Sequence, residues 1–327
     1  MNSRLRNCLK VLRFCRETAL KRDISKLLLN GDILEESDYI DTEVYDATYI
    51  ELERIYDAGI ETVINLGNHD IYGELGGRVL HALRAWRKVT RIVEEPTLVW
   101  GSVQVVPWMS SPALIKAAIR NIRHPEKKCL VLHCGVQGAV TGPRSHLLRN
   151  PIKLRDIRSR EFALILLSDY HTRQRLQRNP PVWYLGSPLQ HSFGEIHKPV
   201  VWDVLLRGDG GTVLRTIETA MPRFRRVSVD SESELRSRTA SFRGDYVKVS
   251  PKSDGLSDRT IERIAKETGF RLQIERKAED TGDFQDVRSA NFQSAMENYV
   301  EASARSEVRR RRLLKLGWRI FNGEGEL

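Results

Sequence analysis

Four aliphatic runs in this chain each end in a short polar stretch, and this arrangement most constrains the fold. The runs occupy residues 26–30, 62–66, 129–132 and 162–167, and the polar stretches that follow carry Asp32, Asn68, His133 and Asp169. Short aliphatic runs separated by helical-looking segments are typical of buried strands. Side chains just beyond the carboxyl ends of such strands can converge on one crevice. We therefore expect a mixed α/β fold with a site at these strand ends.

The length and charge of the chain bear on its organisation and its partners. At 327 residues the chain exceeds one typical domain, so we expect a large domain with a smaller appendage. The formal net charge of +10 favours an anionic partner such as nucleic acid. The cysteines show no zinc-type spacing, which favours a reducing compartment. Residues 1–22 lack the uninterrupted apolar core of a signal peptide or membrane helix. These features predict a cytoplasmic protein without a membrane segment.

The order of the expected elements divides the chain into three parts: residues 1–222, 223–280 and 281–327. Apolar spacing and capping residues predict helices and strands in the first part. The helices are expected at 4–21, 46–58, 77–88 and 112–123, the second of them starting near Asp41 or Asp46, and two more strands at 103–106 and 200–206. Pro222 precedes a small β-α-β-like module, with strands at 245–249 and 271–276 around a helix at 257–268. The third part combines a polar linker with a helix and an apolar tail.

The polar stretches offer ligand types that suit two divalent metal ions. Asp32 can give one carboxylate oxygen to each ion, so it is the candidate bridging ligand. Asn68 offers an amide oxygen, His133 an imidazole nitrogen, and Asp169 and His171 a carboxylate and an imidazole. Such mixed nitrogen and oxygen ligation suits manganese, iron or zinc better than calcium. Two ions roughly 3.5 to 4 Å apart can generate a hydroxide nucleophile and neutralise the charge of a phosphoryl transition state.

The Asn68-His69-Asp70 stretch also contains a candidate catalytic pair. His69 can protonate a leaving oxygen, with Asp70 orienting its ring. Taken singly, each site residue has a plainer interpretation: Gly31-Asp32 is a common turn, and a buried histidine such as His133 is more often a satisfied core residue. The ordered set of four stretches is what favours a metal site.

Taken together, these stretches resemble the calcineurin-like metallophosphoesterase superfamily, whose metal motifs run D-x-H, G-D, G-N-H-D or E, H, and G-H-x-H. The string at 184–195, Tyr-Leu-Gly-Ser-Pro-Leu-Gln-His-Ser-Phe-Gly-Glu, resembles the segment that follows the last motif in SbcD-like nuclease subunits of double-strand-break repair, including phage recombination nucleases. The resemblance covers residues 3–222 well and the remainder more loosely. It implies a two-sheet sandwich flanked by helices in 1–222, a DNA-selecting α+β capping domain in 223–280 and a C-terminal helical tail in 281–327.

The resemblance also implies a role for each site residue. Asp32 bridges two ions, expected to be Mn²⁺ with Mg²⁺, Fe²⁺ or Zn²⁺ as alternatives; Asn68, His133 and Asp169 hold one ion and His171 holds the other. His69 becomes the proton donor. The chain departs from the family by having Ser168-Asp169-Tyr170-His171 in place of Gly-His-x-His, and by lacking the strand with the D-x-H motif before residue 3. We expect a reading frame that starts late, and the competing hypothesis is a degenerate, binding-only relative.

The expected function is a metal-dependent DNA exonuclease or endonuclease subunit that hydrolyses phosphodiester bonds at DNA ends during recombination and repair. The resemblance implies an SMC-like ATPase partner of the SbcC type, bound through 281–327, a homodimer, and a bacterial or phage-infected cell as the setting. The alternatives are a catalytically impaired DNA-binding or scaffolding relative and a phosphatase of the same superfamily.

Several residues near the metal motifs are candidates for contacts with DNA. Arg144, Arg173 and Arg175 can bind backbone phosphates, and the alternative for each is an ordinary solvated basic face. Tyr170 and Trp183 can stack on an unpaired base, although core packing is the favoured role for Trp183.

Overall fold

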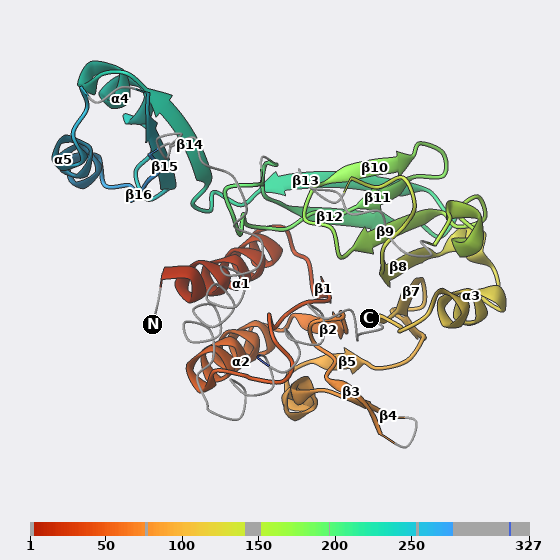
Figure 1. The fold of residues 1–327 in the computed structure, drawn as a ribbon. Coiled ribbons are helices and arrows are strands. Elements are labelled where there is room, and N and C mark those ends of the chain that lie inside the picture. The colour runs from red at the N-terminus through yellow and green to blue at the C-terminus, as the bar shows by residue number, and fades with distance from the viewer. Residues whose placement is uncertain are drawn as a thin grey trace. The chain divides into compact units, whose positions relative to one another are not determined.

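The computed structural model describes residues 3–75, 78–140, 152–195, 197–252, 255–276 and 314 (Figure 1). Every helix and strand described below belongs to one compact unit, Met1–Arg276. The unit is a mixed α/β structure that contains several sheets. The expected partner-binding segment at 281–327 lies outside the described residues, apart from Leu314.

The first sheet is parallel and carries helices on one face. Its strands are β1 (Lys26–Asn30), β2 (Glu61–Asn65) and β5 (Arg91–Val93), in the order β1-β2-β5. The elements that pack on it are α1 (Ser3–Lys21), α2 (Thr42–Asp57) and the 3₁₀ helix η1 (Ala82–Lys88). Asp41 caps α2, because its side chain accepts hydrogen bonds from the backbone N–H groups of Glu43 and Val44. A buried cluster that includes Leu52, Ile64 and Trp86 joins these helices to the sheet.

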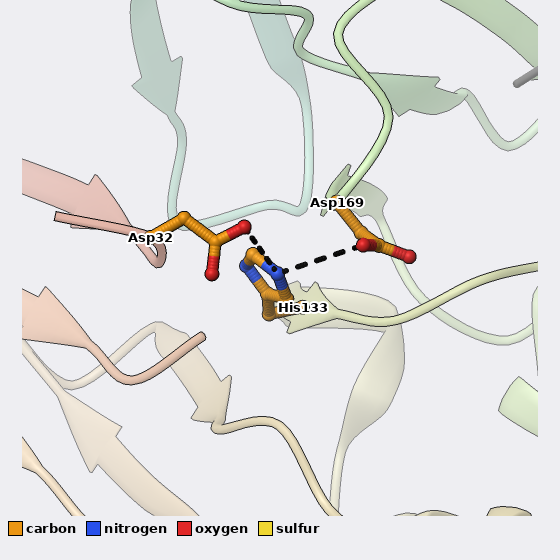
Figure 2. A group of neighbouring side chains, drawn as sticks. All are labelled: Asp32, His133 and Asp169. Carbon is orange, nitrogen blue, oxygen red and sulfur yellow. Dashed lines mark ion pairs between the residues drawn. The ribbon is translucent and has the colours of Figure 1, made fainter. Parts of the chain in front are cut away.

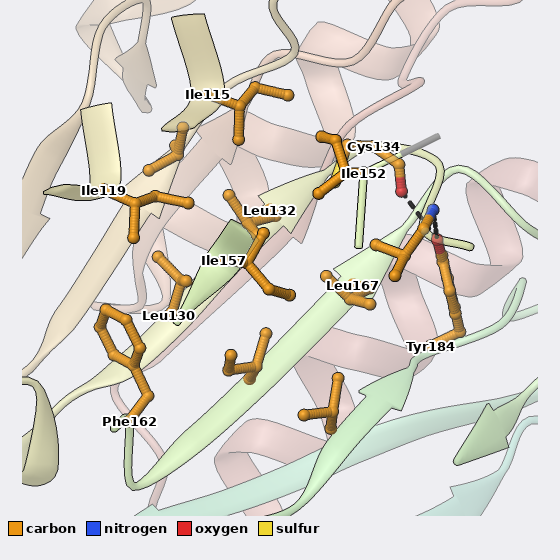
Figure 3. Packing of buried hydrophobic residues seen from close by; sticks show 14 residues of the cluster. Ile115, Ile119, Leu130, Leu132, Cys134, Ile152, Ile157, Phe162, Leu167 and Tyr184 are labelled. Atoms are coloured by element: carbon orange, nitrogen blue, oxygen red, sulfur yellow. Dashed lines mark hydrogen bonds between the residues drawn. The ribbon is translucent and has the colours of Figure 1, made fainter. Parts of the chain in front are cut away.

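The second sheet has six strands in the order β10-β11-β9-β8-β7-β6. They are β6 (Thr97–Val99), β7 (Val103–Val106), β8 (Cys129–His133), β9 (Leu164–Ser168), β10 (Gln174–Gln177) and β11 (Val182–Tyr184). The helices near it are α3 (Pro112–Arg120), η2 (Pro125–Lys127) and η3 (Leu154–Ile157). Figure 3 shows Ile115 and Ile119 of α3 and Ile157 of η3 packed against Leu130 and Leu132 of β8. Helices therefore cover one face of this sheet too.

A shared core joins the uncovered faces of the two sheets. Successive side chains in a strand point to opposite faces, and in β2 Ile64 packs among the helices while Val63 enters a different cluster. That cluster also contains Val131 of β8 and Leu166 of β9, which belong to the second sheet. The hairpin of β12 (Val200–Leu206) and β13 (Thr212–Glu218) packs against the same cluster. One apolar layer thus lies between the two sheets, and each sheet has a second apolar layer between it and its helices.

A small α/β module closes the described part of the chain. Its elements are β14 (Phe224–Val229), α4 (Glu232–Thr239), β15 (Tyr246–Pro251), α5 (Asp258–Thr268) and β16 (Arg271–Ile274). The three strands are parallel, and their apolar side chains pack with both helices in one cluster. Ser231 and Ser257 are the N-caps of the two helices, because their side chains accept hydrogen bonds from the backbone N–H groups of Glu234 and Thr260.

The structure agrees with most of the expected elements and differs at one. The helix expected over 77–88 is wrong in its first half, where β4 (Arg78–Leu80) pairs with β3 (Gly73–Leu75) as an antiparallel hairpin. The two glycines at 76–77 and the β-branched Val79 disfavour a helix there, and helical structure begins only at Ala82. Among the described residues, no helix is long and apolar enough to cross a membrane.

Candidate metal centre

Asp32, His133 and Asp169 come together at the carboxyl ends of three strands. Asp32 lies just beyond β1, His133 ends β8 and Asp169 follows β9 (Figure 2). Nε2 of His133 lies 3.3 Å from Oδ2 of Asp32 and 3.9 Å from Oδ1 of Asp169. One ligand atom from each residue lies within 4.8 Å of the other two. The sequence motifs therefore meet as expected, and the group could hold a metal ion.

The ring of His133 is held in a single orientation by contacts on its far side. Nδ1 lies 3.1 Å from the carbonyl oxygen of Asn30 and 2.9 Å from Oγ of Ser168. The ring is 1% exposed, so these partners are not replaced by water. Because a carbonyl oxygen only accepts, the proton of a neutral ring is on Nδ1 and the Nε2 lone pair faces Asp32 and Asp169. Such a backbone partner is the usual way in which a metal-binding histidine is oriented.

Asn68 adds a further oxygen on the same side of the His133 ring. Its Oδ1 lies 3.0 Å from Nε2 of His133, closer than either carboxylate. Nε2 of a neutral ring and the three oxygens around it are all acceptors. They are stabilised only when the ring gains a second proton or when a cation binds between them. This donor set of one imidazole, one amide and two carboxylates fits a divalent transition metal.

The charges of this group perturb one another. Burial opposes the charged form of Asp32, but hydrogen bonding and attraction from His133 hold its pKa below the ordinary value. Burial likewise disfavours a charged His133, but Asp32 outweighs it and raises the pKa of the ring. The pKa of Asp169 is raised by burial, with Asp32 adding repulsion. The group thus concentrates negative charge that a cation would stabilise.

Two glycines explain why the ligand loops can approach so closely. Gly31 has φ +84°, and a Cβ atom there would lie 2.1 Å from Nδ1 of His133. A Cβ atom on Gly67 would lie 2.2 Å from Oδ1 of Asp32. The Gly-Asp and Gly-Asn pairs in the sequence are therefore required by packing at the site. Asp32 and Asp169 themselves have positive φ values, +54° and +103°, which place them in tight, uncommon backbone turns.

His69 lies beside the site, but Asp70 does not orient it. The His69 ring is exposed, its Nδ1 lies 2.7 Å from the carbonyl oxygen of Glu35, and its backbone N–H donates to Oδ1 of Asp32 at 3.1 Å. Asp70 is buried and accepts hydrogen bonds from four backbone N–H groups instead. The donors are Asp32, Ile33, Leu34 and Gly67. The expectation for Asp70 is thus corrected: it fixes the loops after β1 and β2.

His171 has partners of its own, outside the Asp32-His133-Asp169 group. Its Nδ1 lies 2.8 Å from Oε1 of Glu195, and its ring packs 4.8 Å from that of His191. The hydrogen bond to Glu195 raises the pKa of His171 against the effect of burial, and Asp32 raises it further. Asp32 therefore influences His171, although the metal-ligand group found among the described residues does not include it.

The residues considered for DNA contact have different surroundings. Arg144 lies outside the described residues. The Arg173 backbone lies against Gly186, and the guanidinium of Arg175 lies 5.4 Å from the centre of the Trp183 ring. Trp183 packs in the shared core, as its favoured interpretation predicts. The Tyr170 ring is stacked on Tyr184 at 4.9 Å and joins the apolar cluster of the second sheet, so that face is already used by the core.

Sequence reasoning missed the residues that support the ligands. Ser168 and the Asn30 carbonyl contact His133, and Glu195 contacts His171. Glu195 closes the string at 184–195 that the sequence singled out, which was a usable signal. Comparison with known proteins returned no matching family model and no similar curated protein. The geometry and the sequence motifs therefore carry the functional argument.

Proposed function

We propose that this protein is a divalent-metal-dependent phosphodiester hydrolase that acts on DNA ends. The observation that carries the proposal is the convergence of Asp32, Asn68 and Asp169 on Nε2 of His133, whose other nitrogen is engaged by the Asn30 carbonyl. Bound divalent ions would supply a hydroxide nucleophile and neutralise the charge that develops on the phosphate. Manganese suits this donor set, with Mg²⁺, Fe²⁺ or Zn²⁺ as alternatives.

Each residue of the candidate site has a proposed role. Asp32, Asn68, His133 and Asp169 hold one ion, and Asp32 with His171 holds a second. His69 donates a proton to the leaving oxygen, because its Nδ1 is engaged by Glu35 while the ring remains exposed to an incoming strand. Asp70 keeps the loops of Asp32 and Gly67 together, so its role is to maintain the geometry.

The proposed fold and substrate rest on further features. The two sheets share an apolar core and carry helices on their other faces, which supports the metallophosphoesterase sandwich as the finer description. The net charge of +10 and the string at 184–195 support DNA over a small phosphoester. By the same resemblance we propose that residues 281–327 bind an SMC-like ATPase and that the protein dimerises.

The test is cleavage of linear double- and single-stranded DNA with Mn²⁺ by the full chain. Asn68→Ala and His133→Ala should each lower the cleavage rate at least 100-fold and weaken Mn²⁺ binding, measured by the electron paramagnetic resonance signal of free Mn²⁺. Asp209→Asn, in the exposed turn between β12 and β13, is the control and should leave both unchanged. Unaltered cleavage in the first two variants would refute the ligand assignment.

Three substrates separate the proposal from its alternatives. A nuclease should cleave DNA and a small phosphodiester, whereas a phosphatase should prefer a phosphomonoester. A binding-only relative should bind DNA in a mobility-shift assay. It should hydrolyse none of the three substrates, even with an SMC-like ATPase present. DNA binding without hydrolysis would therefore overturn the enzymatic part of the proposal.

A further inference from the structure

Glu195 uses both oxygens of its carboxylate to hold groups around His171. Oε1 lies 2.8 Å from Nδ1 of His171, and Oε2 accepts a hydrogen bond from the backbone N–H of His191 at 3.0 Å. The Glu195 side chain is 13% exposed, whereas that of His171 is 49% exposed. The carboxylate is thus the more buried partner of this pair, and it has a second hydrogen bond that the imidazole lacks among the described residues.

The segment around Glu195 restrains His171 at other points as well. The backbone N–H of Ser187 donates to the carbonyl oxygen of His171 at 2.9 Å, so the segment binds the main chain as well as the ring. The His191 ring packs against the His171 ring, and its own Nε2 lies 2.8 Å from Oγ of Ser187. The His171 ring is therefore fixed by a hydrogen bond at one edge and by a second imidazole against its face.

A buried glutamine fixes the backbone of Glu195. Nε2 of Gln190 donates to the carbonyl oxygens of Glu195 and His197, at 2.9 and 2.8 Å. Oε1 of Gln190 accepts a hydrogen bond from the backbone N–H of Phe224, the first residue of β14, at 2.7 Å. Gln190 is 5% exposed, so these bonds are made away from water and their loss would leave buried groups unpaired. Glu195 thereby has a rigid base.

We infer that Glu195 is the positioning residue that presents Nε2 of His171 to the metal centre. A carboxylate can only accept, so the proton of a neutral His171 ring is on Nδ1 and Nε2 is left with its lone pair. This is the arrangement in which an imidazole binds a metal, and partners of this kind contribute 10–100-fold to metal affinity or activity. The inference rests on the proposed function, since it assigns Glu195 to the ion that His171 is proposed to hold.

The first experiment determines the tautomer of His171 without any metal. Nitrogen-15 NMR of the full chain labelled at histidine, at a pH where the ring is neutral, reports which nitrogen carries the proton, and His171→Gln identifies the signals. In the natural chain we expect the Nδ1–H form. In Glu195→Ala we expect a mixture dominated by Nε2–H, which unconstrained histidine prefers. A natural chain with the Nε2–H form, or a Glu195→Ala variant that keeps Nδ1–H, would overturn the inference.

The second experiment measures Mn²⁺ binding in a double-mutant cycle. Glu195→Ala should weaken binding of one ion 10–100-fold, and combining it with His171→Ala should add nothing to the loss from His171→Ala alone. Glu195→Gln offers one acceptor for two N–H donors and should fall between. Glu218→Gln, which breaks exposed ion pairs, is the matched control. Additive losses would count against the inference, as would a Glu195→Ala affinity equal to that of the natural chain.

The two proposals can fail separately. A chain that binds Mn²⁺ but cleaves no DNA would end the proposed nuclease function, while the tautomer and the cycle would still test Glu195. Thermal unfolding of each variant separates a local change at His171 from a loss of the fold.

Discussion

Asp70 accepts a hydrogen bond from the backbone N–H of Asp32 at 2.9 Å, through the same oxygen that accepts one from Gly67 at 2.8 Å. Its second oxygen accepts from Ile33 and Leu34. Asp70 is 1% exposed and joins the two loops that carry Asp32 and Asn68. The acidic residue of the Gly-Asn-His-Asp stretch thus holds the two ligand loops together through hydrogen bonds from their backbone N–H groups.

Asp70→Asn should lower both stability and metal affinity. An amide offers one acceptor oxygen, and its NH₂ group would face backbone N–H donors that are already buried. We expect the free energy of unfolding to fall by about 1–3 kcal/mol and Mn²⁺ binding to weaken at least 10-fold, measured by denaturant unfolding and metal titration. Asp41→Asn is the control, because Asp41 also accepts from backbone N–H groups but is an exposed helix cap that asparagine fills well. Equal effects in the two variants would argue against a special role for Asp70.

Adding a methyl group at two glycines should close the metal centre. Gly31→Ala combines an unfavourable positive φ with a Cβ atom 2.1 Å from His133, whereas Gly67→Ala brings a Cβ atom against Asp32 and His133 without a positive φ. Both should abolish Mn²⁺ binding. Gly59→Ala is the matched control: it has φ +75° but no heavy atom within 4 Å of the added Cβ, so it should cost about 1–2 kcal/mol of stability and no metal affinity. Mn²⁺ binding by Gly31→Ala would show that the site geometry is wrong.

His69→Gln should separate proton donation from metal binding. The His69 ring contacts Glu35 and is exposed, so its loss should change Mn²⁺ affinity less than 2-fold. If the ring protonates the leaving oxygen, kcat should fall about 10²–10⁴-fold while KM for DNA stays nearly constant. His124→Gln, an exposed histidine elsewhere, should change neither. A drop in Mn²⁺ affinity as large as that of His133→Ala would instead make His69 a ligand.

The sequence predicted the elements whose signal is local. The aliphatic runs became β1, β2, β8 and β9, and the apolar spacing of residues 4–21 matched the bounds of α1 closely, whereas α2 begins at Thr42, after Asp41, four residues before the expected 46. Such patterns survive because each element buries one stripe or face of its own residues. The prediction for 77–88 was wrong in its first half because residues 78–80 pair with 73–75, and the spacing of apolar residues along one segment carries no information about pairing with another.

The candidate site was predictable as a set of ligands but not as a network. Motif order placed Asp32, His133 and Asp169 at strand ends. Parallel pairing of β8 with β9 brings His133 and Asp169 together, and packing of the first sheet on the second brings Asp32 to them. The partners that orient the ligands were not predictable, because Asn30 acts through a backbone carbonyl and Glu195 lies 24 residues from His171. Asp70 was misassigned for the same reason: its four donors belong to two loops separated in the sequence.

Glu94 offers a test of stability against pH away from the metal centre. Its carboxylate accepts hydrogen bonds from His81, Arg84 and Arg87. Burial works against its charge, but these partners together lower the pKa of Glu94 to about 2 from an ordinary 4.5. A carboxylate with a depressed folded-state pKa stabilises the fold fully above the unfolded value, and the contribution is lost as pH falls from about 4.5 to about 2. Because the Glu94 carboxylate is partly exposed, solvent screens this effect, and we expect a contribution of about 2 kcal/mol at neutral pH.

Glu94→Gln should therefore destabilise the protein in a pH-dependent way. Denaturant unfolding at pH 7 should give a free energy lower than that of the natural chain by about 2 kcal/mol, and the difference should shrink steadily below pH 4.5. Glu126→Gln, whose carboxylate is 58% exposed beside His124, should change stability little at any pH. A Glu94→Gln deficit that stays constant down to pH 2.5 would mean that the carboxylate acts through its shape and packing and that its charge does not contribute.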